Sequence, residues 1–444
     1  LTLHNKSTAG DFNIKGTVTS NGKALNMQND GAGFIVNGNV TSTDGVAAIR
    51  NTNGEFLVDT NGTITSEGTG LSIVNNEDAT GINIKGKIVN KNQLVMQNTG
   101  VDGFNVSGSI ENTGTTQLTN SSEALGGFTL DSTGKITNNG GALSITNNAK
   151  GGMNIKGLIK TNDDGTVAIY NLNSDLKIGD TTDNNYYVDS DGDVYIEVTD
   201  GDLLNAAGEK TLIRTTNQGG GSLTINVDNG AIGEEVATGV GAGSRDWNKS
   251  INVNIDGTIS ATSTGSRSLV NIASSGKDMK LNQITADGQV YLLADDMNGG
   301  VNTYNILNYN DKNTPNIKAA GMSLIASGNI GKEGENVKAV TFVQTDGKFN
   351  DVSWTHLMDG REDVYEPEAE STVDMLAQGD IYTKGLDGEG AAKVDANVGS
   401  IISKQGSVNA EFSGNTYIKE VTAAKDVNLV NRGQKMYIEN LGKV

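Results

Sequence analysis

The densest group of metal-type ligands in the sequence is the acidic turn Asp189-Ser190-Asp191-Gly192-Asp193. Calcium prefers several carboxylate oxygens on a short flexible loop, so Asp189, Asp191 and Asp193 are candidate calcium ligands. Their spacing is not that of an EF-hand loop, and the nonapeptide Gly-Gly-x-Gly-x-Asp of calcium-binding repeats does not occur. An acidic glycine turn without a metal explains the same residues, and no cofactor other than calcium is suggested.

Two residue types could contact or cleave carbohydrate. Trp247 and Trp354 are the only tryptophans, and their rigid aromatic faces could stack on sugar rings. A tryptophan that covers the small core of a loop accounts for them equally well. Glycoside-cleaving enzymes use paired carboxylates within about 10 Å of each other. The candidates for such a pair are Asp189, Asp191, Asp295 and Asp296. Nothing in their spacing brings them together, and solvent-facing acids explain them.

Most other catalytic chemistry lacks the necessary residues. There is no cysteine, which excludes disulfides, thiolate zinc sites and cysteine nucleophiles. The two histidines, His4 and His356, lie 352 positions apart, which argues against a histidine metal cluster or a Ser-His-Asp triad. No P-loop, Gly-x-Ser-x-Gly elbow or His-Glu-x-x-His sequence is present. We therefore expect that the protein is not an enzyme.

A repeat in the first third of the chain dictates how residues are positioned. Seven times, an apolar-x-apolar pair is followed by a Gly-x-Val/Ile step and then by an apolar-x-Asn step. The closing asparagines, spaced by 22, 24, 23, 22, 27 and 24 residues, are Asn29, Asn51, Asn75, Asn98, Asn120, Asn147 and Asn171. A unit of this size cannot bury its own apolar face, so it must stack on copies of itself. The repeat predicts one turn of a parallel β-helix per copy.

Within each repeat the apolar residues alternate with polar ones, as in short half-buried strands. Stacking would place the closing asparagines in a column in which each side-chain amide bonds the next. The alternative is that these asparagines merely populate turns. Stacking would also align the first apolar residues of the repeats, which are Phe12, Phe34, Phe56, Ile82, Phe104, Phe128 and Met153. Seven Asn-Gly dipeptides could instead form hairpins, which would give an antiparallel sandwich.

The fold class that we predict is all-β, a right-handed parallel β-helix, or solenoid, of roughly 17 coils. Only 2 prolines occur, which suits continuous backbone ladders. The right hand follows from the strong preference of parallel crossovers. Residues 1–178 hold the regular repeats of 22–27 residues. Residues 179–444 continue as a less regular β-helix, with loop excursions at 234–249 and 344–374.

Charge and hydropathy exclude two classes of partner. The formal net charge is −20 and the pI is near 4.5, so the chain would repel nucleic acid and anionic membranes. No apolar run reaches the ~18 residues of a transmembrane helix, so we expect no membrane insertion in this segment. The chain opens with Leu1 and shows no basic-then-apolar leader. We interpret it as a piece of a longer, processed protein.

Several phrases in the second half carry a resemblance to a known family. They are Ser222–Val227 leading into Asn229–Gly233, Met279–Val290, Met322–Gly331 and Asp426–Asn431. These phrases resemble the filamentous-haemagglutinin-type large exoproteins of Gram-negative bacteria, leukotoxin-like members included. The resemblance covers most of residues 200–444 and implies a right-handed β-helical shaft, export across the outer membrane, and a role in adhesion or biofilm formation. The family's amino-terminal secretion domain is not in this sequence.

We therefore expect a structural and interaction protein: a rigid shaft segment of a secreted or surface-anchored bacterial adhesin at the outer cell surface. Its partner would be a host or bacterial surface receptor, with carbohydrate as one candidate, contacted through Trp247 and Trp354. One alternative is a self-assembling extracellular filament or sheath subunit that associates end to end, because open strand edges template pairing. Another is a carbohydrate-active β-helix enzyme.

Overall fold

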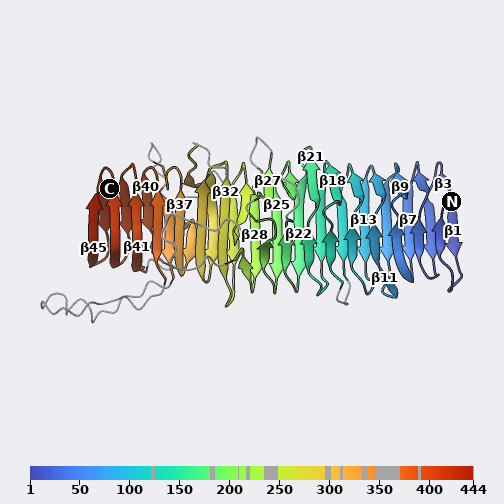
Figure 1. The fold of residues 1–444 in the computed structure, drawn as a ribbon, viewed down its shortest axis with the longest axis horizontal. Coiled ribbons are helices and arrows are strands. Elements are labelled where there is room, and N and C mark those ends of the chain that lie inside the picture. The colour runs from blue at the N-terminus through green and yellow to red at the C-terminus, as the bar shows by residue number, and fades with distance from the viewer. Residues whose placement is uncertain are drawn as a thin grey trace. The chain divides into compact units, whose positions relative to one another are not determined.

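The chain is a parallel β-solenoid of about 15 turns, close to the 17 predicted (Figure 1). The computed structural model describes residues 1–121, 126–180, 186–208, 210–216, 221–234, 249–295, 302–310, 314–332, 339–345, 371–388 and 392–443. No α-helix occurs in these ranges. Two compact units make up the chain: unit 1 is Leu1–Gly230 with Ile255–Gly257, and unit 2 is Ala231–Asn254 with Thr258–Val444. The antiparallel alternative is wrong for both units, because their strands pair in parallel.

Each turn of unit 1 places its strands in three parallel stacks. The first stack is β1 (Thr2–Asn5), β4 (Leu25–Asn29), β7 (Val46–Asn51), β10 (Gly70–Asn75), β13 (Gln93–Asn98), β16 (Thr116–Asn120), β19 (Ala142–Asn147), β22 (Thr166–Leu172), β25 (Val194–Thr199) and β28 (Leu223–Asp228). The second stack is β2 (Phe12–Ile14), β5 (Phe34–Val36), β8 (Gly54–Val58), β11 (Ala79–Ile84), β14 (Phe104–Val106), β17 (Phe128–Leu130), β20 (Met153–Ile155), β23 (Leu176–Ile178) and β26 (Leu203–Asn205). The third stack is β3 (Thr17–Ser20), β6 (Asn39–Ser42), β9 (Thr63–Ser66), β12 (Lys87–Asn90), β15 (Ser109–Asn112), β18 (Lys135–Asn139), β21 (Leu158–Asn162), β24 (Val188–Ser190) and β27 (Ile213–Thr215).

The alternation of apolar and polar residues sets which side chains enter the core of unit 1. In β13, for example, Leu94, Met96 and Asn98 are buried, whereas Val95 and Gln97 face outward. A shift of one residue would turn every one of these side chains to the other face, so the repeat fixes the register. The strands consequently pair so that equivalent repeat positions lie side by side, as Asn29 does with Asn51.

A column of large apolar side chains runs through the second stack. Phe12, Phe34 and Phe56 are register partners in successive turns, and their ring centroids lie 4.9 and 5.3 Å apart. Phe104 and Phe128 form a second tilted pair at 5.2 Å. Ile82 and Met153 occupy the same column, as do Leu176 and Leu203 further along. The first apolar residues of the seven repeats are thus aligned, as predicted.

Unit 2 contains two stacks. The first is β31 (Ile259–Ser263), β33 (Met279–Ala286), β35 (Ile306–Asn308), β36 (Ile317–Ala319), β38 (Val340–Gln344), β40 (Ile381–Gly385), β42 (Val408–Phe412) and β44 (Val427–Asn431). The second is β29 (Ala231–Ile232), β30 (Ile251–Asn254), β32 (Leu269–Ser275), β34 (Gln289–Asp295), β37 (Gly321–Ala326), β39 (Val373–Ala377), β41 (Ala396–Ser403), β43 (Thr416–Ala423) and β45 (Met436–Lys443).

The reduction to two stacks occurs at β32. The two short strands β29 and β30 both pair with this one strand, through Ala231 with Leu269 and through Ile251 with Ile272. From β32 onward each turn therefore has one long strand in the place of two short ones. Unit 2 therefore lacks the three-strand repeat of unit 1, although its strands still stack in parallel.

Candidate functional site

A column of buried asparagine side chains closes the first stack of unit 1. Asn29 Nδ2 donates to Asn51 Oδ1 at 2.8 Å, and each following amide repeats this bond to the next turn. All seven asparagines singled out in the sequence lie in this ladder and are 0% exposed. Asn5 adds a further member, because its Nδ2 donates to Asn29 Oδ1 at 2.8 Å. Its place 24 residues before Asn29 is the signal that the sequence offered.

The ladder ends where the repeat changes. Asn171 accepts from Asn147, but its register partner in the next turn is Val198. The ladder amides also bond the corner that directly follows their own strand: Asn98 Nδ2 donates to Asp102 O, and Gly100 N donates to Asn98 Oδ1. The asparagines therefore form hydrogen bonds between consecutive turns of the solenoid and also to the backbone of the corners. This combines the ladder and the turn interpretations of the sequence.

A second buried polar column, absent from our sequence predictions, ends the third stack. Its members are small polar residues in register: Ser20, Ser42, Ser66, Asn90, Asn112, Asn138, Thr161, Ser190 and Thr215. Asn90 Nδ2 donates to Asn112 Oδ1 at 2.8 Å, and Thr161 and Ser190 hydroxyls lie 3.0 Å apart. The first seven each stand four residues after the glycine of the Gly-x-Val/Ile step, which is the signal that could have revealed them.

The outer side of the first stack forms a surface that we call the neutral face. It consists of the outward side chains of β1, β4, β7, β10, β13, β16, β19 and β22. These strands contain no Asp, Glu or Lys, and Arg50 is their only Arg. The third stack is equally regular yet carries Lys87, Glu111 and Lys135. In a chain of net charge −20, the neutral face is therefore a distinct surface.

Register places the outward side chains of the neutral face in two rows. One row contains His4, Gln28, Arg50, Val74, Gln97, Thr119, Thr146 and Tyr170. The other contains Thr2, Asn26, Ala48, Ser72, Val95, Gln117, Ser144 and Ala168. Amides and hydroxyls predominate in both rows, and the small apolar residues among them are Val74 in the first row and Ala48, Val95 and Ala168 in the second. Such a surface can form hydrogen bonds and apolar contacts together.

The neutral face is hollowed over β1, β4, β7 and β10. The hollow measures about 480 Å³ and is lined in part by Asn26, Gln28, Ala48, Arg50, Ser72 and Val74. It arises because the short side chains of Ala48, Ser72 and Val74 lie beside longer ones. Its volume is within the range of roughly 300–1,000 Å³ that is usual for ligand pockets. Arg50 borders it. With the Asn76 amide turned so that its oxygen faces the guanidinium, Arg50 Nη2 and Nε donate to that oxygen at 2.9 and 3.3 Å.

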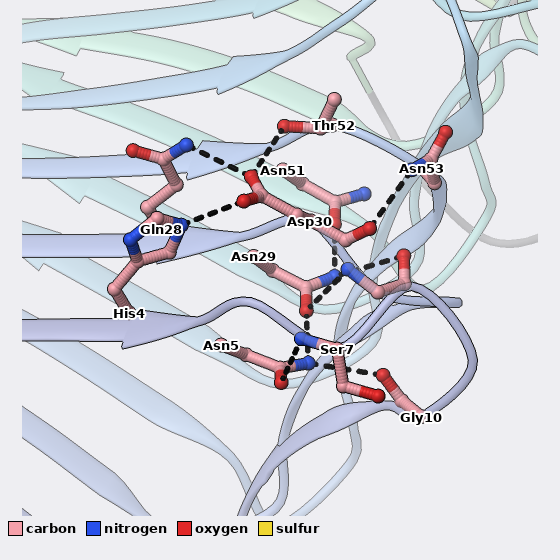
Figure 2. Close-up of polar contacts among 11 residues, drawn as sticks. His4, Asn5, Ser7, Gly10, Gln28, Asn29, Asp30, Asn51, Thr52 and Asn53 are labelled. Atoms are coloured by element: carbon pink, nitrogen blue, oxygen red, sulfur yellow. Dashed lines mark hydrogen bonds and ion pairs between the residues drawn. The ribbon is translucent and has the colours of Figure 1, made fainter.

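Figure 2 shows a polar cluster around Asp30, whose partners His4 and Gln28 also line the hollow. Asp30 Oδ2 lies 2.7 Å from His4 Nε2, and Asp30 Oδ1 accepts from Gln28 Nε2 at 2.8 Å. Thr52 Oγ1 donates to the same carboxylate at 3.3 Å, and Asn53 Nδ2 donates to the backbone oxygen of Asp30 at 2.9 Å. The hydrogen bonds from Gln28 and then His4 lower the pKa of Asp30 below its ordinary value. Through these two hydrogen bonds, the Asp30 carboxylate orients Gln28 and His4 beside the hollow.

The far end of the neutral face meets an aromatic pair. Tyr170 on β22 and Tyr195 on β25 have ring centroids 5.6 Å apart at 46°. Tyr195 Oη donates to Glu197 Oε2 at 2.6 Å and accepts from Asn226 Nδ2 at 3.1 Å. Burial, together with the bond to Glu197, raises the pKa of Tyr195. The second ring is thus held in one orientation, with both rings half-buried.

The three candidate calcium ligands contact protein groups. Asp189 is 7% exposed and binds Arg214 through two hydrogen bonds of 2.8 and 2.7 Å. Asp191 accepts from Asp164 N and from Thr216 Oγ1, and Asp193 accepts from Ser222 N. In the described part of the chain, no three His, Cys, Asp or Glu side chains are grouped so that they could hold a metal ion.

Arg214 is the partner that our sequence predictions missed. It lies one turn after Asp189 in register, and its guanidinium also covers the ring of Tyr186 at 3.8 Å from the centroid. The hydrogen bonds to Asp189 raise the pKa of Arg214 further. Asp189 therefore belongs to an ion pair of the third stack in which the carboxylate is buried and Arg214 stays partly exposed.

The remaining candidates fall partly outside the described residues. Trp247, Trp354 and Asp296 lie there, as do most of the predicted excursions at 234–249 and 344–374. Asp295 ends β34 and is half-buried.

Comparison with known proteins adds no family. A scan against protein-family models found no match, and neither the curated proteins nor the solved structures returned one. Among the described residues, no helix is long and apolar enough to cross a membrane.

Proposed function

We propose that this chain is a structural and interaction protein, a rigid shaft segment of a secreted or surface-anchored bacterial adhesin. The observation that carries the proposal is the buried asparagine ladder inside unit 1, which bonds every turn from Asn5 to Asn171 to the next. The second polar column and the apolar column stack in register beside it. A bend between turns would have to break ladder hydrogen bonds and separate packed side chains of the core, so this construction resists bending.

Reach is the physical property that such a construction provides. From β1 to β28, unit 1 spans nine turn-to-turn steps, which is about 43 Å at the usual strand spacing. Each added turn extends the stack without a new core, because a solenoid contacts only its neighbours. The phrases that resemble filamentous-haemagglutinin-type exoproteins support a location at the outer cell surface.

The test uses cells that produce the protein. Immunogold electron microscopy should place the label outside the outer membrane, and a deletion strain should attach to surfaces less than its parent. Complementation with the intact gene is the control. Label confined to the cytoplasm, or unchanged attachment by the deletion strain, would contradict the proposal.

Two assays on the purified chain separate the alternatives. Electron micrographs should show single particles, whereas end-to-end polymers would favour a filament subunit. Incubation with polysaccharides should release no oligosaccharides, whereas sustained release would favour an enzyme.

A further inference from the structure

We propose that the neutral face binds a linear, uncharged polysaccharide, which lies across the strands along the two outward rows. This inference goes beyond the shaft function, because a shaft needs stacking but no particular outer surface. It is carried by the charge distribution, the unpaired polar groups, the hollow and the aromatic end of the face.

The polar groups of the face are available for a ligand. Among the described residues, the side chains of Gln93, Gln97 and Gln117 have no hydrogen-bond partner and lie exposed or half-buried. A sugar hydroxyl both donates and accepts, so it can satisfy either end of a glutamine amide. A contact with another protein surface that excludes water would instead bury these amides without hydrogen-bond partners, and each buried amide would cost free energy. The face therefore favours a hydroxyl-rich ligand over a second copy of the chain.

The spacing along the rows suits a polymer. Successive outward side chains are separated by about 4.8 Å, the distance between neighbouring strands, and a pyranose ring in an extended chain advances by a comparable distance. Val74 and Val95 are separated from Gln97 and Gln117 by one such step. Apolar C–H faces and hydroxyl edges of successive sugars could thus meet matching groups. Eight strands give a track of about 34 Å.

Two features mark where the ligand is held. The hollow of about 480 Å³ can take sugar substituents at one end, with the Arg50 and Asn76 pair and the Asp30-oriented Gln28 as polar contacts. At the other end, the ring of Tyr170 lies in the first row against the fixed ring of Tyr195. Tyrosine supplies an apolar face beside a polar tip, which suits a pyranose.

The charge distribution favours an uncharged ligand. The net charge of −20 repels polyanions, and the face offers one guanidinium, which already bonds Asn76. A polymer with a carboxylate or sulfate on each sugar would find no series of cations. Neutral sugars avoid both the repulsion and the need for cationic partners, and they can bind through the amides and hydroxyls of the face.

The experiment is calorimetric titration of the purified full chain with four neutral hexasaccharides: β-1,4-linked glucose, xylose and N-acetylglucosamine, and α-1,4-linked glucose. A hexauronate is the charged comparison. We expect binding of at least one neutral hexasaccharide and none of the hexauronate. Gln97→Glu and Gln117→Glu should each weaken binding about tenfold, the equivalent of one net hydrogen bond. Circular dichroism and the melting temperature should show that both variants stay folded.

The matched control is Asn105→Asp, which makes the same amide-to-acid change at an exposed position of β14 on the second stack. It should bind as the wild type does. The proposal is overturned if no neutral hexasaccharide binds, if the hexauronate binds better, or if Asn105→Asp weakens binding as much as Gln97→Glu. It is also overturned if sedimentation shows a dimer that Gln97→Glu dissociates, because the face would then be an interface between copies.

Discussion

Replacing Asn98 by leucine tests whether the buried amide ladder stabilises the stack. Asn98 is 0% exposed and takes part in four hydrogen bonds. Leucine has a similar shape but removes all four. Asn75 Nδ2 and Asn120 Oδ1 would then face each other across a buried apolar side chain. The buried amide Gly100 N would lose its acceptor as well. Each buried group left without a partner costs about 1–3 kcal/mol, so these three groups predict a loss of about 3–9 kcal/mol.

The measurement has to be local, because a solenoid can open turn by turn. Native-state hydrogen exchange should show faster exchange at Thr99 and Val101, whose amides bond the preceding turn. Urea unfolding of the same variant gives the global change. Asn105→Leu, at an exposed outward position, is the control and should change stability by less than about 0.5 kcal/mol. A loss below about 1 kcal/mol for Asn98→Leu would refute the view that the ladder holds the turns together.

Three further predictions concern single side chains. Asp189→Asn should cost about 3 kcal/mol in urea unfolding, because it leaves the Arg214 guanidinium without its carboxylate, and adding Arg214→Gln should restore part of that loss. Phe104→Ala should cost about 3–5 kcal/mol, since it opens a cavity between Ile82 and Phe128, whereas a loss near that of an exposed site would contradict the apolar column. The pKa of Asp30 is lowered below 3.8 in the folded state, so the stability it contributes is complete above 3.8 and is lost as the pH falls through the lower, folded value. The difference in urea midpoint between the wild type and Asp30→Asn should therefore shrink in acid, and a constant difference down to pH 2 would refute this.

The internal columns of unit 1 could be predicted where one residue type recurs. Asn29 to Asn171 and the phenylalanines repeat at nearly constant spacing, so stacking follows from the period alone. The second polar column escaped because serine, asparagine and threonine substitute for one another within it, as Ser66, Asn90 and Thr161 do. Each is small and forms hydrogen bonds, which is all that the buried position requires.

The ion pair and the change in unit 2 could not be predicted because both depend on turn lengths that vary. Arg214 reaches Asp189 only because their strands are register partners, 25 residues apart. The sequence between them does not indicate how many residues the connecting corner contains. Likewise, the sequence around Ala231 and Ile251 contains no signal that their two short strands pair with a single strand of the next turn.

Repetition by itself does not explain the neutral face. In stacked turns, a repeated charge would lie directly beside its own copy, which is destabilising, so strict repetition disfavours charges everywhere. The third stack nevertheless tolerates them by alternating their sign, as Lys87 and Glu111 do at 2.9 Å. The first stack could have done the same at Gln97 and Gln117, yet from β1 to β22 Arg50 is its only Lys, Arg, Asp or Glu. The difference between two equally regular stacks therefore requires a cause outside the stacking itself, and a ligand that prefers uncharged amides and hydroxyls supplies one.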